Sequence, residues 1–205
     1  MTPPEHVAYY RILNHGCRRQ THDLQKCKTF LSILKRGVNI LYQDKQQSNN
    51  PQSRLEAYLA LRQLAIKTTP VNVGVVPVPG TKAPFGVLMD FSLPQGNATI
   101  AAFISGDASF YTNTGGGVIG GIGHENVRHA ARKFIAVAAN YLDKMVSTVA
   151  YPLPEPGKVR FYVLTPSGIF TYEAGEPDLR KNALSPLYAA GHRVLNELIA
   201  ATQKK

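Results

Sequence analysis

A run of six glycines within nine residues, 115–123, most restricts how this chain can fold. The run follows a short apolar and aromatic segment and precedes a stretch with helical spacing of apolar residues. Glycine loses more conformational freedom on folding than any other residue, so this density predicts positive φ angles or close approach of another group. Because Val118 and Ile119 lie inside the run, we expect it to pack against the core rather than to form a solvated flap.

Short strands are expected before and after this run. Segments 85–91 and 98–104 flank residues with the turn chemistry of a hairpin, and Gly106-Asp107 then turns the chain into a third strand, 108–112. Segments 159–164 and 169–172 flank a second turn, Thr165-Pro166-Ser167-Gly168. The sequence therefore predicts about five strands in two groups.

Helices are predicted between and around these strands. Ser53 can cap a helix that runs to about Ile66, and prolines exclude a regular helix from the connector that follows. One apolar stripe predicts a long helix after the glycines, through Val127, Ala131, Phe134, Ala138, Tyr141, Leu142 and Met145. A further amphipathic helix is expected over 184–199.

The order of three strands, helix, two-strand hairpin and helix predicts an α+β fold. Its sheet should be antiparallel, because the links between strands are too short for parallel crossovers, and the helices should cover its apolar face or faces. The element order resembles profilin-like and roadblock-like folds. Residues 53–205, with Gly86-Val87-Leu88-Met89-Asp90 and Gly106-Asp107-Ala108-Ser109, are similar to an uncharacterised bacterial protein family. That resemblance implies no activity.

The charge distribution divides the chain. The net charge is +10, and residues 1–50 hold eight Lys and Arg against three acidic residues, whereas the remaining +5 is spread over residues 51–205. Segment 46–53 is a polar run with a proline near its end, which is typical of a linker or an exposed loop. We predict a basic helical extension over 1–50, with partial disorder as the alternative, and a single α+β domain over 51–205.

The extension carries the residues for one alternative function. Residues 21–36 have the spacing of a basic amphipathic helix. Clustered cations bind phosphate backbones, so nucleic-acid binding through 11–36 is an alternative. It would use Arg18, Arg19, Lys26 and Lys28.

A zinc site in the extension is not expected. Cys17, His22 and Cys27 have the spacing of the last three ligands of a zinc knuckle. Asn14 stands where the fourth ligand belongs, and the nearest substitute, His15, has a spacing one residue short. We predict no metal, and also no other cofactor.

The glycine run is the candidate ligand site. Its Gly-x-Gly-x-x-Gly spacing matches a dinucleotide fingerprint, but the hairpins around it do not supply the parallel unit and the downstream acidic residue that this fingerprint needs. A generic anion site at the start of the following helix is the remaining interpretation. The candidate residues are Gly116, Gly117, Gly120, Gly121, His124 and Arg128.

Catalytic residues cannot be assigned from the sequence. His124 and His129 are one position too far apart for a zinc-protease helix, and no nucleophile elbow or phosphate loop is present. Asp90 and Asp107, near strand ends, could lie close together in the sheet. We expect a non-enzymatic binding or regulatory module that contacts an unknown protein or itself, with an enzyme or ligand-binding site at 115–128 as the alternative. No apolar stretch approaches the ~20 residues needed to span a bilayer, and we expect a cytoplasmic protein without membrane contact.

Overall fold

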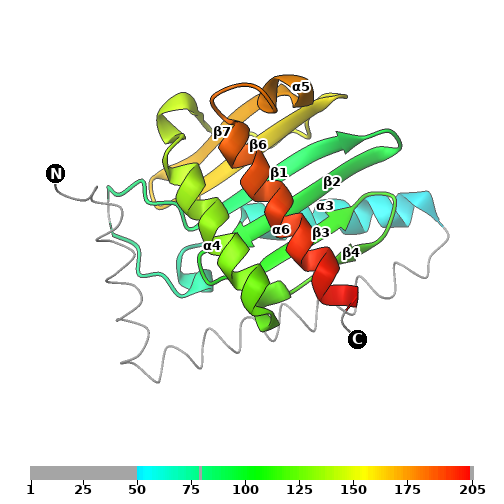
Figure 1. Ribbon diagram of the computed structural model, residues 1–205, viewed down its shortest axis with the longest axis horizontal. Helices are drawn as coiled ribbons and strands as arrows, with labels where there is room; N and C mark the ends of the chain where they lie inside the picture. Colours follow the sequence, from blue (N-terminus) through cyan, green and yellow to red (C-terminus); the bar gives the residue numbers. More distant parts are fainter. Residues whose placement is uncertain (1–49, 79, 204–205) are drawn as a thin grey trace.

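An antiparallel sheet of seven strands organises the described part of the protein (Figure 1). The computed structural model describes residues 50–78 and 80–203. The strand order is β4-β3-β2-β1-β6-β7-β5. The strands are β1 (Gly86–Leu93), β2 (Gly96–Phe103), β3 (Ala108–Thr112), β4 (Gly117–Val118), β5 (Val146–Thr148), β6 (Lys158–Thr165) and β7 (Gly168–Gly175). The α-helices among the described residues are α3 (Pro51–Ile66), α4 (Glu125–Ala139), α5 (Glu176–Leu179) and α6 (Ser185–Gln203).

The five predicted strands form the centre of this sheet and confirm the α+β class. Leu93 pairs with Gly96, so Pro94 and Gln95 alone turn β1 into β2. β1 also pairs with β6 in antiparallel register, which joins the two groups of strands into one sheet.

The prediction of about five strands is wrong in number. Two short strands, β4 and β5, extend the sheet at its two edges. Both are too short to show the alternation of apolar and polar residues by which a strand is recognised.

The long central helix also ends earlier than its apolar stripe predicts. α4 stops at Ala139, and the chain continues through a 3₁₀ turn, Leu142–Lys144, into β5. Tyr141 and Lys144 donate backbone hydrogen bonds to the carbonyls three residues before them, which tightens the chain before it reaches the sheet edge. Met145, the residue directly before β5, is buried in the main core.

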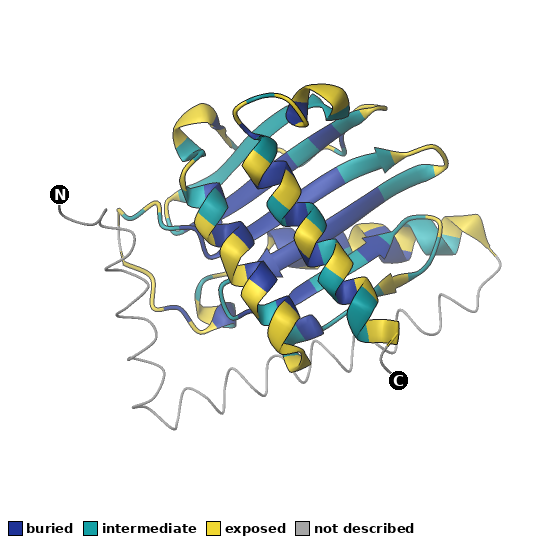
Figure 2. Cartoon of the chain, in the orientation of Figure 1, coloured by how far each residue is buried: buried dark blue, intermediate teal, exposed yellow. Residues whose placement is uncertain are grey.

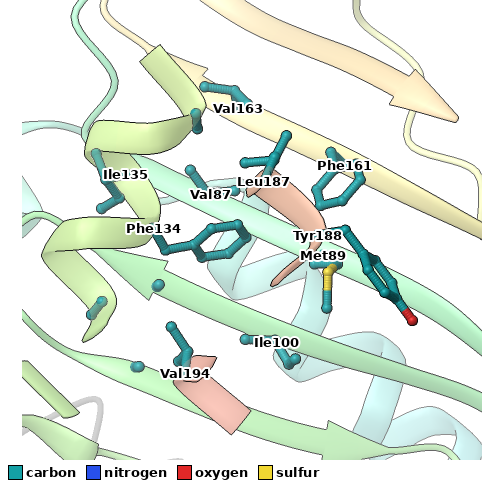
Figure 3. Packing of buried hydrophobic residues seen from close by; sticks show 14 of the residues in the cluster. Val87, Met89, Ile100, Phe134, Ile135, Phe161, Val163, Leu187, Tyr188 and Val194 are labelled. Atoms are coloured by element: carbon teal, nitrogen blue, oxygen red, sulfur yellow. The ribbon is translucent and has the colours of Figure 1, made fainter. Parts of the chain in front are cut away.

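Helices α4 and α6 cover one face of the sheet, and the main core lies beneath them (Figures 1 and 2). Figure 3 shows how their side chains interleave with those of the strands. Phe134 and Ile135 come from α4 and Leu187 and Val194 from α6, opposite Val87, Met89, Ile100, Phe161 and Val163. Gly191 allows α6 to approach the sheet closely, because a Cβ there would lie 2.7 Å from the Met89 sulfur.

Helix α3 packs on the opposite face, so both faces of the sheet are covered by helix. Its end, at Ala65 and Ile66, packs with Leu88 and Tyr162. Asn50, not Ser53, caps this helix: its side chain accepts a hydrogen bond from the Gln52 amide at 3.0 Å. The extension predicted over 1–50 falls almost entirely outside the described residues, so the division into two parts stays a prediction.

Candidate functional site

The glycine run combines a turn, an edge strand and a tightly packed segment. Gly115 and Gly116 both have φ of 94°, and Gly120 has φ of 78°, a region that favours glycine. Between them, β4 pairs with Phe110 and Tyr111 of β3. The positive φ angles expected from the sequence are therefore present.

Close packing explains a further glycine of the run. A Cβ at Gly121 would lie 2.6 Å from Val127 and 2.7 Å from Leu198, closer than carbon atoms pack. The next amide, of Ile122, donates to the Asp107 carboxylate at 3.2 Å. Val118 packs against the main core and Ile119 against the side of α3, as the packed interpretation of the run predicts.

Of the two side chains expected to bind an anion here, one already has protein partners and the other is exposed. Arg128 donates to the Ile122 carbonyl at 2.8 Å and forms an ion pair with Glu125. His124 is the exposed residue before α4 and makes no side-chain capping hydrogen bond. Gly116 and Gly117 lie in the turn and in β4. The structure thus gathers these residues in one loop, with the guanidinium already occupied, and ligand binding there stays a prediction.

The other candidates lie outside the described residues. These are the basic residues Arg18, Arg19, Lys26 and Lys28 and the weak metal candidates His15, Cys17, His22 and Cys27. Among residues 50–203, apart from 79, no group of three His, Cys, Asp or Glu side chains could hold a metal ion. The same residues include no helix long and apolar enough to cross a bilayer.

A buried ion pair, which the sequence analysis missed, joins α3 to the sheet. Arg62 donates from Nε to Asp90 at 2.8 Å, and both side chains are almost completely buried. Thr99 on β2 donates to the other Asp90 oxygen at 2.6 Å, and the Tyr58 hydroxyl lies 3.0 Å from Thr99. Arg62 also donates to the Tyr151 carbonyl at 2.9 Å.

Burial and the ion pair act in opposite directions on the pKa values of this network. Burial raises the pKa of the Asp90 carboxyl, against the opposing effect of Arg62 and Thr99. Burial on its own lowers the pKa of Arg62, but the charge and hydrogen bond of Asp90, together with Tyr162 and Tyr58, outweigh it and the net pKa is raised. Because Asp90 and Arg62 both have hydrogen-bond partners within the protein, the arrangement fixes α3 on the sheet and leaves no carboxylate free to act on a ligand. Asp107 instead accepts a hydrogen bond from the Ile122 amide just before α4. The two aspartates therefore hold different parts of the chain in place.

A second polar cluster lies where α6 begins. Glu176 accepts hydrogen bonds from the Tyr188 hydroxyl and from Arg180, both at 2.6 Å. The hydrogen bond from Tyr188 is the main cause of a lowered pKa of Glu176, and burial raises the pKa of Tyr188 to about 12. The ring of His192 packs 4.4 Å from the Tyr188 ring, and its buried Nε2 has no hydrogen-bond partner in the described structure. Figure 3 shows the Tyr188 ring at the border of the main core.

The sheet edge at β5 carries exposed apolar side chains. β5 pairs with β7 and forms the end of the sheet. The side chain of Val146 on this strand is 68% exposed, and that of Val149, directly after it, is 92% exposed. Large apolar side chains with this exposure next to an open edge mark a surface available for contact.

No protein-family model, curated protein or solved structure matches this chain. The resemblance to an uncharacterised bacterial family therefore stays a prediction. The function has to be argued from the geometry of the described residues.

Proposed function

We propose that this protein is a binding module that contacts another polypeptide through the β5 edge of its sheet. The observation that carries the proposal is the exposure of Val146 on an edge strand that pairs with β7, and of Val149 directly after that strand. An extended segment of the partner would add to this edge as a further strand. Backbone hydrogen bonds then supply affinity, and the exposed valines supply apolar contact.

The composition of β5 supports this assignment. Folded proteins protect open edges with charged residues, proline or a covering element. The segment 145–150, Met-Val-Ser-Thr-Val-Ala, contains no charge and no proline. Lys144 directly precedes it and Pro152 follows one residue after it, so the stretch without charge or proline has the length of a short strand.

The opposite edge is a weaker candidate. β4 has two residues, one of them a glycine, and Val118 is half-buried. The turn before it is held by Arg54, which donates to the Thr114 carbonyl at 3.2 Å. A partner strand would find less backbone and less apolar surface there.

The remaining alternatives are a ligand site at 115–128 and nucleic-acid binding through 11–36. The first has less support, since Arg128 is engaged by Ile122 and Glu125. The second concerns residues outside the described part of the chain. We propose a cytoplasmic location. The binding partner would be another protein or a second copy of this chain.

Site-specific photo-crosslinking of the full chain in cells tests this function. A photoreactive amino acid at Val146 should give a recurring protein adduct. The matched control is Leu59 on the outer side of α3, which is 42% exposed and should give none of that adduct. An identified adduct must bind again as a purified protein, and the Val146→Lys variant should lose it. Equal adducts at both positions, or none at Val146, would contradict the proposal.

A further inference from the structure

A groove of about 380 Å³ lies between helices α4 and α6. The two helices run side by side over the sheet, and their outer surfaces are exposed (Figures 1 and 2). Pockets of a few hundred Å³ are large enough for small-molecule ligands. The groove is lined by Asn126, His129, Ala130, Lys133, Arg193 and Glu197.

Hydrogen-bond donors from α4 converge on this groove. Asn126, His129 and Lys133 are spaced by three and four residues, which places them on one face of the helix. The side chains of these three residues make no hydrogen bond or ion pair with the rest of the described chain. Asn126 also belongs to the first turn of α4, where the helix dipole favours negative charge.

The opposite wall adds a guanidinium and one carboxylate. Arg193 pairs with Glu197 at 2.6 Å across one turn of α6. The Glu197 side chain is only 13% exposed, whereas that of Arg193 is 69% exposed. Because the single acid of the lining is matched by Arg193, the charge of Lys133 is left uncompensated within the groove. Arg193 makes this one ion pair and stays largely exposed, so its guanidinium retains donors for a second anion, whereas Arg128 holds both a carbonyl and a carboxylate and its side chain is only 29% exposed.

We propose that the α4–α6 groove binds a small anionic ligand, through a phosphate or carboxylate group held by Lys133, His129 and Arg193. Charge-assisted hydrogen bonds from lysine and arginine are the strongest recognition that protein side chains offer to such groups. The lining contains none of the six residues proposed for the glycine-run site and no residue of β5, so the proposal does not depend on the proposed protein contact.

Amide NMR titration of the full-length protein tests the site. Inorganic phosphate and malate are added in parallel, so that the tighter ligand shows whether phosphate or carboxylate is preferred. We expect saturable shifts at residues 125–133 and 193–197. Lys133→Gln should raise the dissociation constant about tenfold, which is the effect of losing one charged hydrogen bond. Lys181→Gln makes the same change of charge at an exposed position outside the groove and should have no effect.

A second variant tests the role assigned to Glu197. Glu197→Gln removes the only acid of the lining and frees Arg193, so phosphate should bind more tightly. Weaker or unchanged binding by this variant would contradict the proposal. Absence of saturable shifts in the groove with both anions, or equal weakening by Lys133→Gln and Lys181→Gln, would overturn it.

Discussion

Arg62 and Asp90 form an ion pair, with 2.7 Å between Nη2 and Oδ2, that is buried between α3 and β1. Removing one partner of such a pair leaves an uncompensated charge in the core. We predict that Asp90→Asn lowers the free energy of unfolding by about 3–5 kcal/mol, measured by urea denaturation. The control Arg180→Met breaks the exposed pair with Glu176 and should cost less than about 1 kcal/mol. Equal losses would show that the buried pair has no special role.

The glycine run provides a second, internally controlled prediction. Gly121→Ala would place a Cβ against Val127 and Leu198, so we expect a loss of about 1–3 kcal/mol from overpacking. At Gly123 the same Cβ would meet no atom within 4 Å and φ lies outside the positive region. Gly123→Ala should therefore be neutral or stabilise the fold by up to about 1 kcal/mol. Denaturant unfolding of both variants checks this, and a neutral Gly121→Ala would remove the argument for a packed loop.

The pH dependence of stability should report on His192. Burial lowers the pKa of this imidazole, whereas Glu176 raises it and Arg180 lowers it further. The ring also packs on Tyr188 and Phe91. In the unfolded chain a histidine has a pKa of about 6.5, so the unfolded state binds the proton more readily than the folded one. The stability that His192 contributes is thus present above about pH 6.5 and is lost as the pH falls below it.

Chemical denaturation between pH 7 and pH 5 measures this effect. The His192→Gln variant should show a smaller loss of stability on acidification than the unaltered protein. His129→Gln changes an exposed ring on α4 and should retain the full loss. If His192→Gln and the unaltered protein lose stability equally, another group is responsible.

The division of the chain also yields a prediction. A fragment that begins at Asn50 keeps the residue that caps α3 and both layers of helix on the sheet. We expect it to unfold in one cooperative thermal transition. If the fragment shows no transition while the full chain does, residues 1–49 contribute to the core.

The sequence predicts the centre of this fold better than its edges. The strands from 85 to 112 and from 158 to 175 alternate or contain β-branched and aromatic residues, and tight turns connect them, so local chemistry defines them. β5 cannot be found in this way, because three residues carry no period and the preceding apolar stripe continues the helical spacing of α4. The edge becomes visible only when β7 supplies its partner.

The buried ion pair was missed although two signals were present. Asp90 is the one charged residue in the otherwise apolar segment 87–91. Arg62 lies on the same helical face as Tyr58 and Ile66. A charge at a core position in each of two elements indicates a buried pair. What the sequence lacks is the register, because Asp90 could have faced either side of the sheet.

The central claim is that the β5 edge binds a polypeptide, and an affinity measurement tests it most directly. The partner identified by crosslinking at Val146, or the protein itself if the adduct is a second copy, is titrated against the purified full chain by calorimetry. We predict that Val146→Lys abolishes measurable binding while unfolding free energy changes by less than about 0.5 kcal/mol, since the residue is exposed. The matched variant Leu59→Lys should bind as the unaltered protein does. Full affinity of Val146→Lys would contradict the account.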